Sequence, residues 1–254
     1  MKIVVKVGTS TLAHATGRLN LKRTGELCRV LSDLKNAGHE VILVSSGAIG
    51  MGASKLALLQ KPTDVPTKQA AAAVGQCELM YAYDKLFAEY GHTVAQILLT
   101  GSDFTASDRH DNFSNTINRL LQLQVLPIIN ENDTVATEEI KVGDNDTLSA
   151  LVAVSVKADL LVILSDVDGL YSADPKRDEN ATLIQEVHGI TDELLSLGGG
   201  AGTSLGTGGM KTKLTAAKLC NENGVDTVIA NGENPVLLYD IVENKKGGFT
   251  RFFA

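Results

Sequence analysis

Short aliphatic runs recur along the chain, and segments with helical spacing separate them. The runs predict buried β-strands at 3–7, 40–44, 93–99, 125–129, 160–164, 225–230 and 249–253. Helical spacing predicts helices at 27–34, 68–90, 108–123, 144–157 and 211–223, with a short helix after Pro235. Because strands and helices alternate through most of the chain, we expect an α/β protein. Its architecture would be an αβα sandwich with a mainly parallel central sheet covered by helices on both faces.

Composition narrows the class of protein. The chain has 254 residues, enough for one large α/β domain or two lobes. A net charge of −7 gives no overall field that attracts nucleic acid or an anionic membrane, so we expect neither partner. An anionic substrate would need a local cluster of cations. The three cysteines show no CxxC spacing and no window resembles a signal peptide or membrane span, so we expect free thiols and a cytoplasmic location.

Glycine-containing turns follow two of the predicted strands. Lys6 lies just before Gly8 at the first strand end, where the lysine would reach a phosphate and the glycine would let backbone amides approach it. A solvated edge lysine is the alternative for Lys6 taken alone. At the second strand end, Ser46 and Gly47 begin a strand-to-helix turn of the kind that binds anions.

A third glycine-rich run enters a predicted helix between Gly206 and Lys213. It is not a Walker loop, because Met210 stands where a glycine should precede the lysine. Two lysines, Lys211 and Lys213, fall in the first helical turn, where they oppose the helix dipole by up to ~1 kcal/mol. A purely structural role does not explain that placement, so the run favours a phosphate site.

Two clusters of acidic and amide residues flank one polar hairpin, at Asn130–Asp133 and Asp144–Asp146. The first follows a predicted strand and the second begins a predicted helix. An ordinary turn and an N-cap would account for either cluster alone. Two such clusters around one hairpin favour a binding site. Asp166 and Asp168 follow a later strand, but the ligand pattern of a calcium loop is missing there.

No histidine pair has metal-binding spacing, and no Ser/His/Asp pattern is apparent. What remains is a set of glycine loops, lysines beside two of them, and carboxylates at a helix start. Phosphoryl transfer needs these parts: backbone amides and cations for the charge on the transferred group, and an acid that orients the cations.

Six motifs together are similar to the amino-acid kinase family, and they occur in the family's order over essentially the whole chain. They begin at Lys6, Val44, Ile129, Lys141, Ser165 and Gly206. The resemblance implies one kinase domain over 1–254, in which a lobe at about 1–157 binds an amino acid and a lobe at about 158–254 binds ATP. Many members carry a further C-terminal PUA domain, and we expect a form without it because the sequence stops at Ala254.

The resemblance also implies roles for individual residues. Lys6 and Lys213 would flank the transferred γ-phosphoryl group, and Asp146 would orient both ammonium groups. The amino acid would contact Ser46, Asp133 and Asn145, with Gly47, Asn130 and Asp144 close by. The nucleotide would be held by Lys6, Gly8, Ser165, Asp166, Thr207, Gly208, Gly209, Met210, Lys211, Thr212 and Lys213.

The branch that it resembles phosphorylates the side-chain carboxylate of L-glutamate with ATP and Mg²⁺, giving L-glutamyl 5-phosphate for proline synthesis. A carboxylate is already ionised at neutral pH, so the absence of a general base fits this reaction. The resemblance further implies inhibition by proline, transfer of the product to glutamyl phosphate reductase, and a homo-oligomer. The alternatives are a family member that acts on N-acetylglutamate or aspartate, and a non-catalytic sensor of amino acid or nucleotide.

Overall fold

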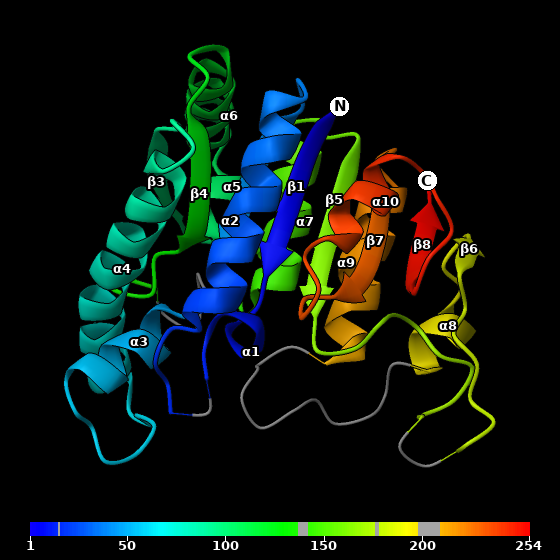
Figure 1. Cartoon of the computed structure of the whole chain (residues 1–254), viewed down its shortest axis with the longest axis horizontal. Coiled ribbons are helices and arrows are strands. Elements are labelled where there is room, and N and C mark those ends of the chain that lie inside the picture. Colours follow the sequence, from blue (N-terminus) through cyan, green and yellow to red (C-terminus); the bar gives the residue numbers. More distant parts are fainter. Residues whose placement is uncertain (15, 137–141, 176–177, 198–208) are drawn as a thin grey trace.

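The computed structural model describes residues 1–14, 16–136, 142–175, 178–197 and 209–254. One eight-stranded sheet forms its centre, with the strand order β3-β4-β2-β1-β5-β7-β8-β6 (Figure 1). The strands are β1 (Lys2–Val7), β2 (Glu40–Ser45), β3 (Val94–Leu99), β4 (Leu126–Glu131), β5 (Leu160–Ser165), β6 (Glu186–His188), β7 (Asp226–Asn231) and β8 (Phe249–Phe253). The longer helices are α2 (Leu21–Asn36), α3 (Ala48–Lys55), α4 (Val65–Ala88), α6 (Ser107–Gln122), α7 (Asn145–Ser155) and α9 (Met210–Asn221). The shorter ones are α1 (Thr9–Leu12), α5 (Ser102–Thr105), α8 (Asp192–Leu197) and α10 (Leu237–Val242).

The sheet is parallel except at one edge. Strand β1 pairs in parallel with β2 on one side and with β5 on the other, and β3, β4 and β7 continue the parallel arrangement. Strand β8 runs antiparallel to β7, and β6 pairs with β8. A mainly parallel sheet, as the sequence predicts, is therefore confirmed.

Alternating side chains of each strand feed two separate cores. In β1, Ile3, Val5 and Val7 pack with α2, α4 and α10, while Val4 packs on the opposite face with α6, α7 and α9. All four side chains are fully buried. Period-two alternation between two apolar layers is what a sheet covered on both faces requires. Lys6 shares the face of Val4, so its side chain points toward α7 and α9.

The connections change to the opposite face of the sheet between β1 and β5. The connection from β1 to β2 passes through α2 on one face of the sheet, whereas the connection from β5 to β7 passes through α9 on the other. Such a reversal opens a space outside the carboxyl ends of the two strands, which is where ligands bind in open α/β sheets. Lys6 and Ser165 lie at those two strand ends.

Helices α3 and α4 cross with almost no space between their backbones. A Cβ atom at Gly52 would lie 1.7 Å from the carbonyl oxygen of Ala71, and one at Gly75 would lie 1.8 Å from that of Ala48. Only hydrogen fits at both positions. This contact fixes α3, and with it the turn at Ser46 and Gly47, against the middle of α4.

The element boundaries differ from the predictions in a few places. Helix α4 begins earlier, because the Asp64 side chain accepts a hydrogen bond from the Thr67 amide and caps it. Strand β4 extends through Asn130 and Glu131, which the sequence placed after the strand end, because both residues pair with the end of β3. The short elements α1, α5, α8 and β6 were not predicted, since three to six residues carry little periodicity. The hairpin predicted after β4 lies partly outside the described residues.

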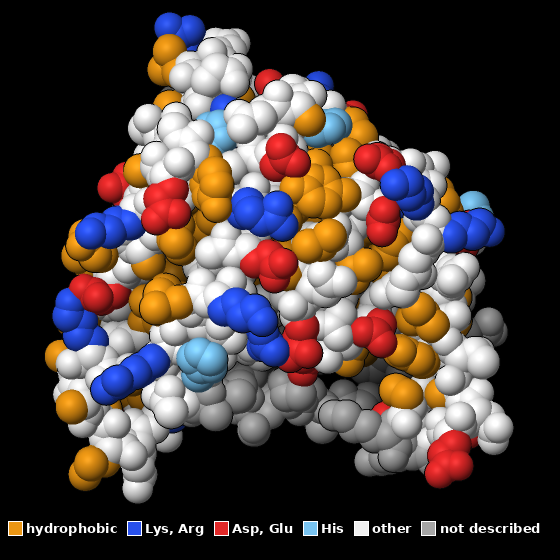
Figure 2. Space-filling view, in the orientation of Figure 1, with side chains coloured by type: hydrophobic (Ala, Val, Ile, Leu, Met, Phe, Trp, Pro, Cys, Tyr) orange, Lys and Arg blue, Asp and Glu red, His pale blue; other side chains and the backbone are white. Residues whose placement is uncertain are grey.

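All three cysteines are free, as expected, with Cys28 and Cys220 buried and Cys77 exposed. Figure 2 shows acidic and basic side chains interspersed on the face that α2 and α10 cover. Among the described helices, none is long and apolar enough to cross a membrane.

Candidate active site

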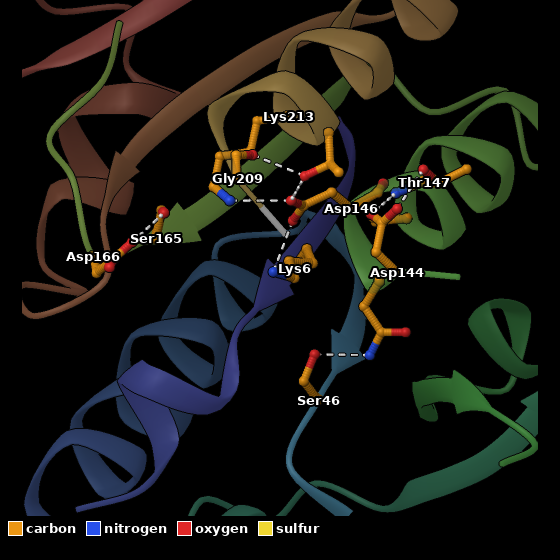
Figure 3. A network of polar contacts seen from close by, with 12 residues as sticks. Lys6, Ser46, Asp144, Asp146, Thr147, Ser165, Asp166, Gly209 and Lys213 are labelled. Carbon is orange, nitrogen blue, oxygen red and sulfur yellow. Dashed lines mark hydrogen bonds and ion pairs between the residues drawn. The ribbon is translucent and has the colours of Figure 1, made fainter. Parts of the chain in front are cut away.

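Two lysines from distant parts of the chain meet on one buried carboxylate. Lys6 Nζ lies 2.7 Å from Asp146 Oδ1, and Lys213 Nζ lies 3.0 Å from Asp146 Oδ2 (Figure 3). Lys6 comes from the end of β1, Asp146 from the first turn of α7, and Lys213 from the first turn of α9. The three side chains predicted as catalytic are thus adjacent at the carboxyl edge of the sheet.

The charge on Asp146 is maintained against its burial. Only 1% of this residue is exposed, and burial alone would raise its pKa. The attraction and hydrogen bonds of Lys6 and Lys213 outweigh burial, so that the pKa of Asp146 lies below its ordinary value. Asp146 is therefore an ionised group that holds two ammonium groups in place.

A threonine of α9 also contacts Asp146. The Thr212 hydroxyl lies 2.9 Å from Asp146 Oδ2 and 2.8 Å from the Gly209 carbonyl oxygen. The sequence assigned Thr212 to the nucleotide site. In the structure its hydroxyl joins the start of α9 to Asp146, and the nucleotide role stays a prediction. Gly209 is the N-cap of α9 and makes no side-chain cap bond to this helix, whose N-terminal amides form the kind of end that binds anions.

A second cluster, of amides and hydroxyls, lies beside this ion-paired group. Asn145 Nδ2 lies 2.8 Å from Ser46 Oγ, 3.2 Å from the Ser45 carbonyl oxygen and 2.9 Å from Asn130 Oδ1. Gly47, next to Ser46, has φ +110° and is the N-cap of α3. The structure therefore brings together Ser46, Gly47, Asn130 and Asn145, which the sequence assigned to one amino-acid pocket.

The two remaining acids of that prediction have different surroundings. Asp144 is the N-cap of α7: its carboxylate accepts from the Thr147 amide at 2.9 Å and from the Thr147 hydroxyl at 3.0 Å. These bonds are the capping chemistry that was the alternative interpretation. Asp133 lies half-buried in the turn after β4.

The predicted nucleotide residues are only partly described. Ser165 ends β5, and its hydroxyl lies 3.1 Å from Asp166 Oδ1. A Cβ atom on Gly8 would lie 3.4 Å from Lys6 Nζ, so that Gly8 is next to the ammonium group. Met210 and Lys211 begin α9 with Thr212 and Lys213. Thr207 and Gly208 lie outside the described residues.

Sequence reasoning missed the residues of α4 that support the pocket. The Gln76 side chain accepts from Asn130 Nδ2 at 3.0 Å, and the Tyr83 hydroxyl lies 2.8 Å from Ser45 Oγ. Both residues are buried on the same face of α4 as Leu79. A glutamine within an otherwise apolar helical stripe was the available signal.

This arrangement combines two fixed ammonium groups, a helix N-terminus that begins at a glycine, and an adjacent cluster of amides and hydroxyls, at the point where the winding of the sheet reverses. It defines an α/β protein whose site suits a transferred anionic group. A model of the amino acid kinase family matches residues 1–231. The chain belongs to the amino acid kinase family.

Relatives and solved structures agree with this classification. The chain is 56% identical to a protein named glutamate 5-kinase from Clostridium tetani, over 97% of this chain and 92% of that one. It is 54% identical to a glutamate 5-kinase of Caldanaerobacter subterraneus, over 98% of this chain and 67% of that one. The crystal structure of UMP kinase from Ureaplasma parvum is similar in fold, with a TM-score of 0.69 and 17% identity over 100% of this chain and 98% of that one.

Proposed function

We propose that this chain transfers the γ-phosphoryl group of ATP to the side-chain carboxylate of L-glutamate, giving ADP and L-glutamyl 5-phosphate as a step of proline biosynthesis. The observation that carries the proposal is the bridging of Lys6 and Lys213 by Asp146 beside the Ser46–Asn145 cluster. The choice of L-glutamate as the acceptor rests on the relatives named glutamate 5-kinase.

The two lysines address the main barrier of this reaction. An anionic carboxylate must approach an anionic triphosphate, and the charge on the transferred group must be stabilised during transfer. Asp146 holds both ammonium groups at fixed positions before substrates bind, so little reorganisation is needed. The acceptor oxygen is already ionised at neutral pH, and the reaction therefore requires no general base.

The two substrates would approach the carboxyl ends of β1 and β5 from opposite sides. The residues grouped around Asn145 come from the proposed amino-acid lobe, about 1–157, and Ser165 and the start of α9 come from the proposed ATP lobe, about 158–254. Lys6 lies in the first lobe and Lys213 in the second, so each lobe supplies one ammonium group. In this proposal the γ-phosphoryl group passes between them.

Mg²⁺ enters the proposal as the ion that accompanies ATP. Among the described residues there is no group of three or more His, Cys, Asp or Glu side chains that could hold a metal. Asp146 is also engaged by both lysines. This donor set suits an ion held mainly by substrate phosphates and water. Inhibition by proline, a homo-oligomeric state, hand-off to a reductase and a cytoplasmic location stay predictions.

The test compares three acids with Mg-ATP at matched concentrations: L-glutamate, N-acetylglutamate and L-aspartate. ADP release and hydroxamate formation in the presence of hydroxylamine report the acyl phosphate. L-Glutamate should give the highest kcat/KM, because acetylation removes the ammonium charge and aspartate is one methylene shorter. A higher kcat/KM for either other acid would transfer the chain to another branch of the family. If none of the three acids supports ADP release, the alternative of a non-catalytic sensor is favoured.

A further inference from the structure

Gln76 lies between Gln96 and Asn130 in a network of hydrogen-bonded side-chain amides. The network ends in the proposed amino-acid pocket. Gln76 Oε1 accepts from Asn130 Nδ2 at 3.0 Å, and Gln76 Nε2 donates to Gln96 Oε1 at 3.0 Å. On the other side of Asn130, Asn145 Nδ2 connects Asn130 Oδ1 to Ser46 Oγ. Gln76 and Asn130 are buried, at 8% and 3% exposure, so water does not readily replace these bonds.

Backbone groups determine which way each amide points. The Glu131 amide donates to Asn130 Oδ1 at 2.9 Å, and an N–H group can only donate. Asn130 must therefore direct its oxygen toward Asn145 and its nitrogen toward Gln76. The Ser45 carbonyl oxygen, which can only accept, fixes Asn145 Nδ2 in the same sense. Two independent anchors thus give the network one polarity.

That polarity determines what the pocket presents to a ligand. The two hydrogens of Asn145 Nδ2 face three acceptors, one of which is Ser46 Oγ. Ser46 Oγ is thereby an acceptor from Asn145, and its own proton remains for another partner. Within the described part of the chain, no group donates to Asn145 Oδ1. The pocket therefore presents a donor at Ser46 and an acceptor at Asn145, which match the carboxylate and the ammonium of a free amino acid.

We infer that Gln76 is a positioning residue for the amino acid: by accepting from Asn130, it keeps Asn130 and Asn145 in the orientation that leaves the Ser46 hydroxyl proton free to bind substrate. The inference rests on the proposed function. Gln76 touches neither the ion-paired lysines nor the residues assigned to ATP in the contacts described. Its loss should therefore weaken binding of the amino acid and leave ATP binding unchanged.

Two substitutions of similar size at this position separate orientation from packing. Gln76→Met fills the space but offers Asn130 no strong acceptor. Gln76→Glu keeps an acceptor oxygen for Asn130 whether its carboxyl group is ionised or protonated, and the exposed Gln96 side chain can turn to accommodate either form. Gln122→Met, on exposed helix surface of α6, is the control for replacing an amide by a thioether.

Steady-state kinetics of ADP release give the test, with circular dichroism to check folding. We expect Gln76→Met to raise KM for glutamate about tenfold with KM for ATP changed less than about twofold, since one aligned hydrogen bond is lost. In Gln76→Glu, KM for glutamate and KM for ATP should each stay within about threefold of the original protein. The control Gln122→Met should have the same two constants as the original protein. If Gln76→Met does not fold, Gln76→Ala removes the same acceptor without added bulk and replaces it.

The possible outcomes separate this inference from the proposed function. A KM for glutamate that is the same in the Met and Glu variants would show that the acceptor oxygen at this position does not orient Asn130. Parallel increases of both Michaelis constants would show a general disturbance of the fold, and either result overturns the inference while the proposed function stands. If the unmodified protein releases no ADP with glutamate, the proposed function fails, and with it the substrate named here.

Discussion

Lys6 and Asp146 form a buried ion pair, 2.7 Å from Nζ to Oδ1, between the end of the central strand β1 and the start of α7. The second oxygen of Asp146 is occupied by Lys213 at 3.0 Å. One carboxylate therefore sets the separation of two cations, one from β1 and one from α9. Because both oxygens are used, Asp146 is suited to hold the cations and not to accept a proton during the reaction.

We predict that Lys213→Ala lowers kcat by roughly 10²–10³, because one preorganised charge is lost from the transferred group. Asp146 keeps Lys6 as a partner, so the fold should survive. The measurement is ADP release with Mg-ATP and glutamate, alongside circular dichroism. Lys218→Ala, further along α9 and paired with Asp192 at the surface, is the matched control and should leave kcat unchanged. A folded Lys213→Ala protein with normal turnover would remove Lys213 from the reaction.

Asp146→Asn should reduce both activity and stability. The asparagine keeps the size of the side chain but leaves two buried ammonium groups without a counter-charge, which costs about 3–5 kcal/mol. Urea unfolding at pH 7 measures this loss. Asp84→Asn, at an exposed position of α4, should change stability by less than about 0.5 kcal/mol.

The stability lost in Asp146→Asn should also depend on pH, and it should become smaller as the pH falls. The folded-state pKa of Asp146 lies below its unfolded-state value, because Lys6 and Lys213 outweigh the effect of burial. The stabilisation from its charge is therefore complete well above the unfolded-state pKa of about 3.9 and is lost as pH falls through the folded-state pKa. The difference in unfolding free energy between the original protein and Asp146→Asn should be constant from pH 7 to about 5 and shrink below about 4. A difference that grows on acidification would contradict the assignment.

Two glycine-to-alanine substitutions should act in opposite directions. Gly75→Ala should destabilise the protein by about 3 kcal/mol or more and raise KM for glutamate, because its Cβ would lie 1.8 Å from the Ala48 carbonyl oxygen. Gly25→Ala, inside α2, meets only Leu86 at 3.9 Å and should stabilise by about 0.5–1 kcal/mol. Thermal unfolding of both variants checks the pair. A Gly75→Ala protein that is as stable as Gly25→Ala would mean that α3 and α4 can move apart at little cost.

The sequence predicted the layers of the fold because each long element carries its own period. The apolar run that begins at Ile3 predicts a strand buried on both faces, and the structure places Val4 in one apolar layer and Ile3 and Val5 in the other. The family resemblance named Lys6, Asp146 and Lys213 together, and the structure brings them to one edge of the sheet, where strand ends and helix starts converge. That Asp146 holds both lysines came from the family resemblance, and the distances bear it out.

The sequence could not reveal contacts that depend on how helices cross. Gln76 and Tyr83 lie in α4, between Ser45 and Asn130 in the sequence and far from both, and only the packing of α4 brings them to these residues. The near contact of Gly52 and Gly75 with facing backbones likewise has no local pattern. Asn130 was placed after the end of its strand because its polarity masked its pairing with β3. In each case a tertiary contact outweighs the local signal.

Asp133→Asn tests the acid that lies in the turn after β4. It removes a charge from the proposed amino-acid pocket and leaves the start of α9 intact, so KM for glutamate should rise far more than KM for ATP. Michaelis constants for both substrates, measured in the same preparation, give the answer. Equal increases would place Asp133 outside the amino-acid pocket.

Substitutions of Asp144 can separate helix capping from substrate binding. Capping needs only an acceptor oxygen on the side chain, whereas pairing with a substrate ammonium needs its charge. Its bonds to Thr147 are those of an N-cap, and a serine hydroxyl caps a helix nearly as well as a carboxylate. If capping is its main role, Asp144→Ser should retain stability and KM for glutamate, whereas Asp144→Ala should lose about 0.5–2 kcal/mol and shift the start of α7. That start carries Asn145 and Asp146, so the alanine variant should also lose activity. Urea unfolding and glutamate kinetics on both variants decide the matter. A serine variant that is fully stable but needs much more glutamate would show that the charge of Asp144 acts on the substrate, in addition to its capping of α7.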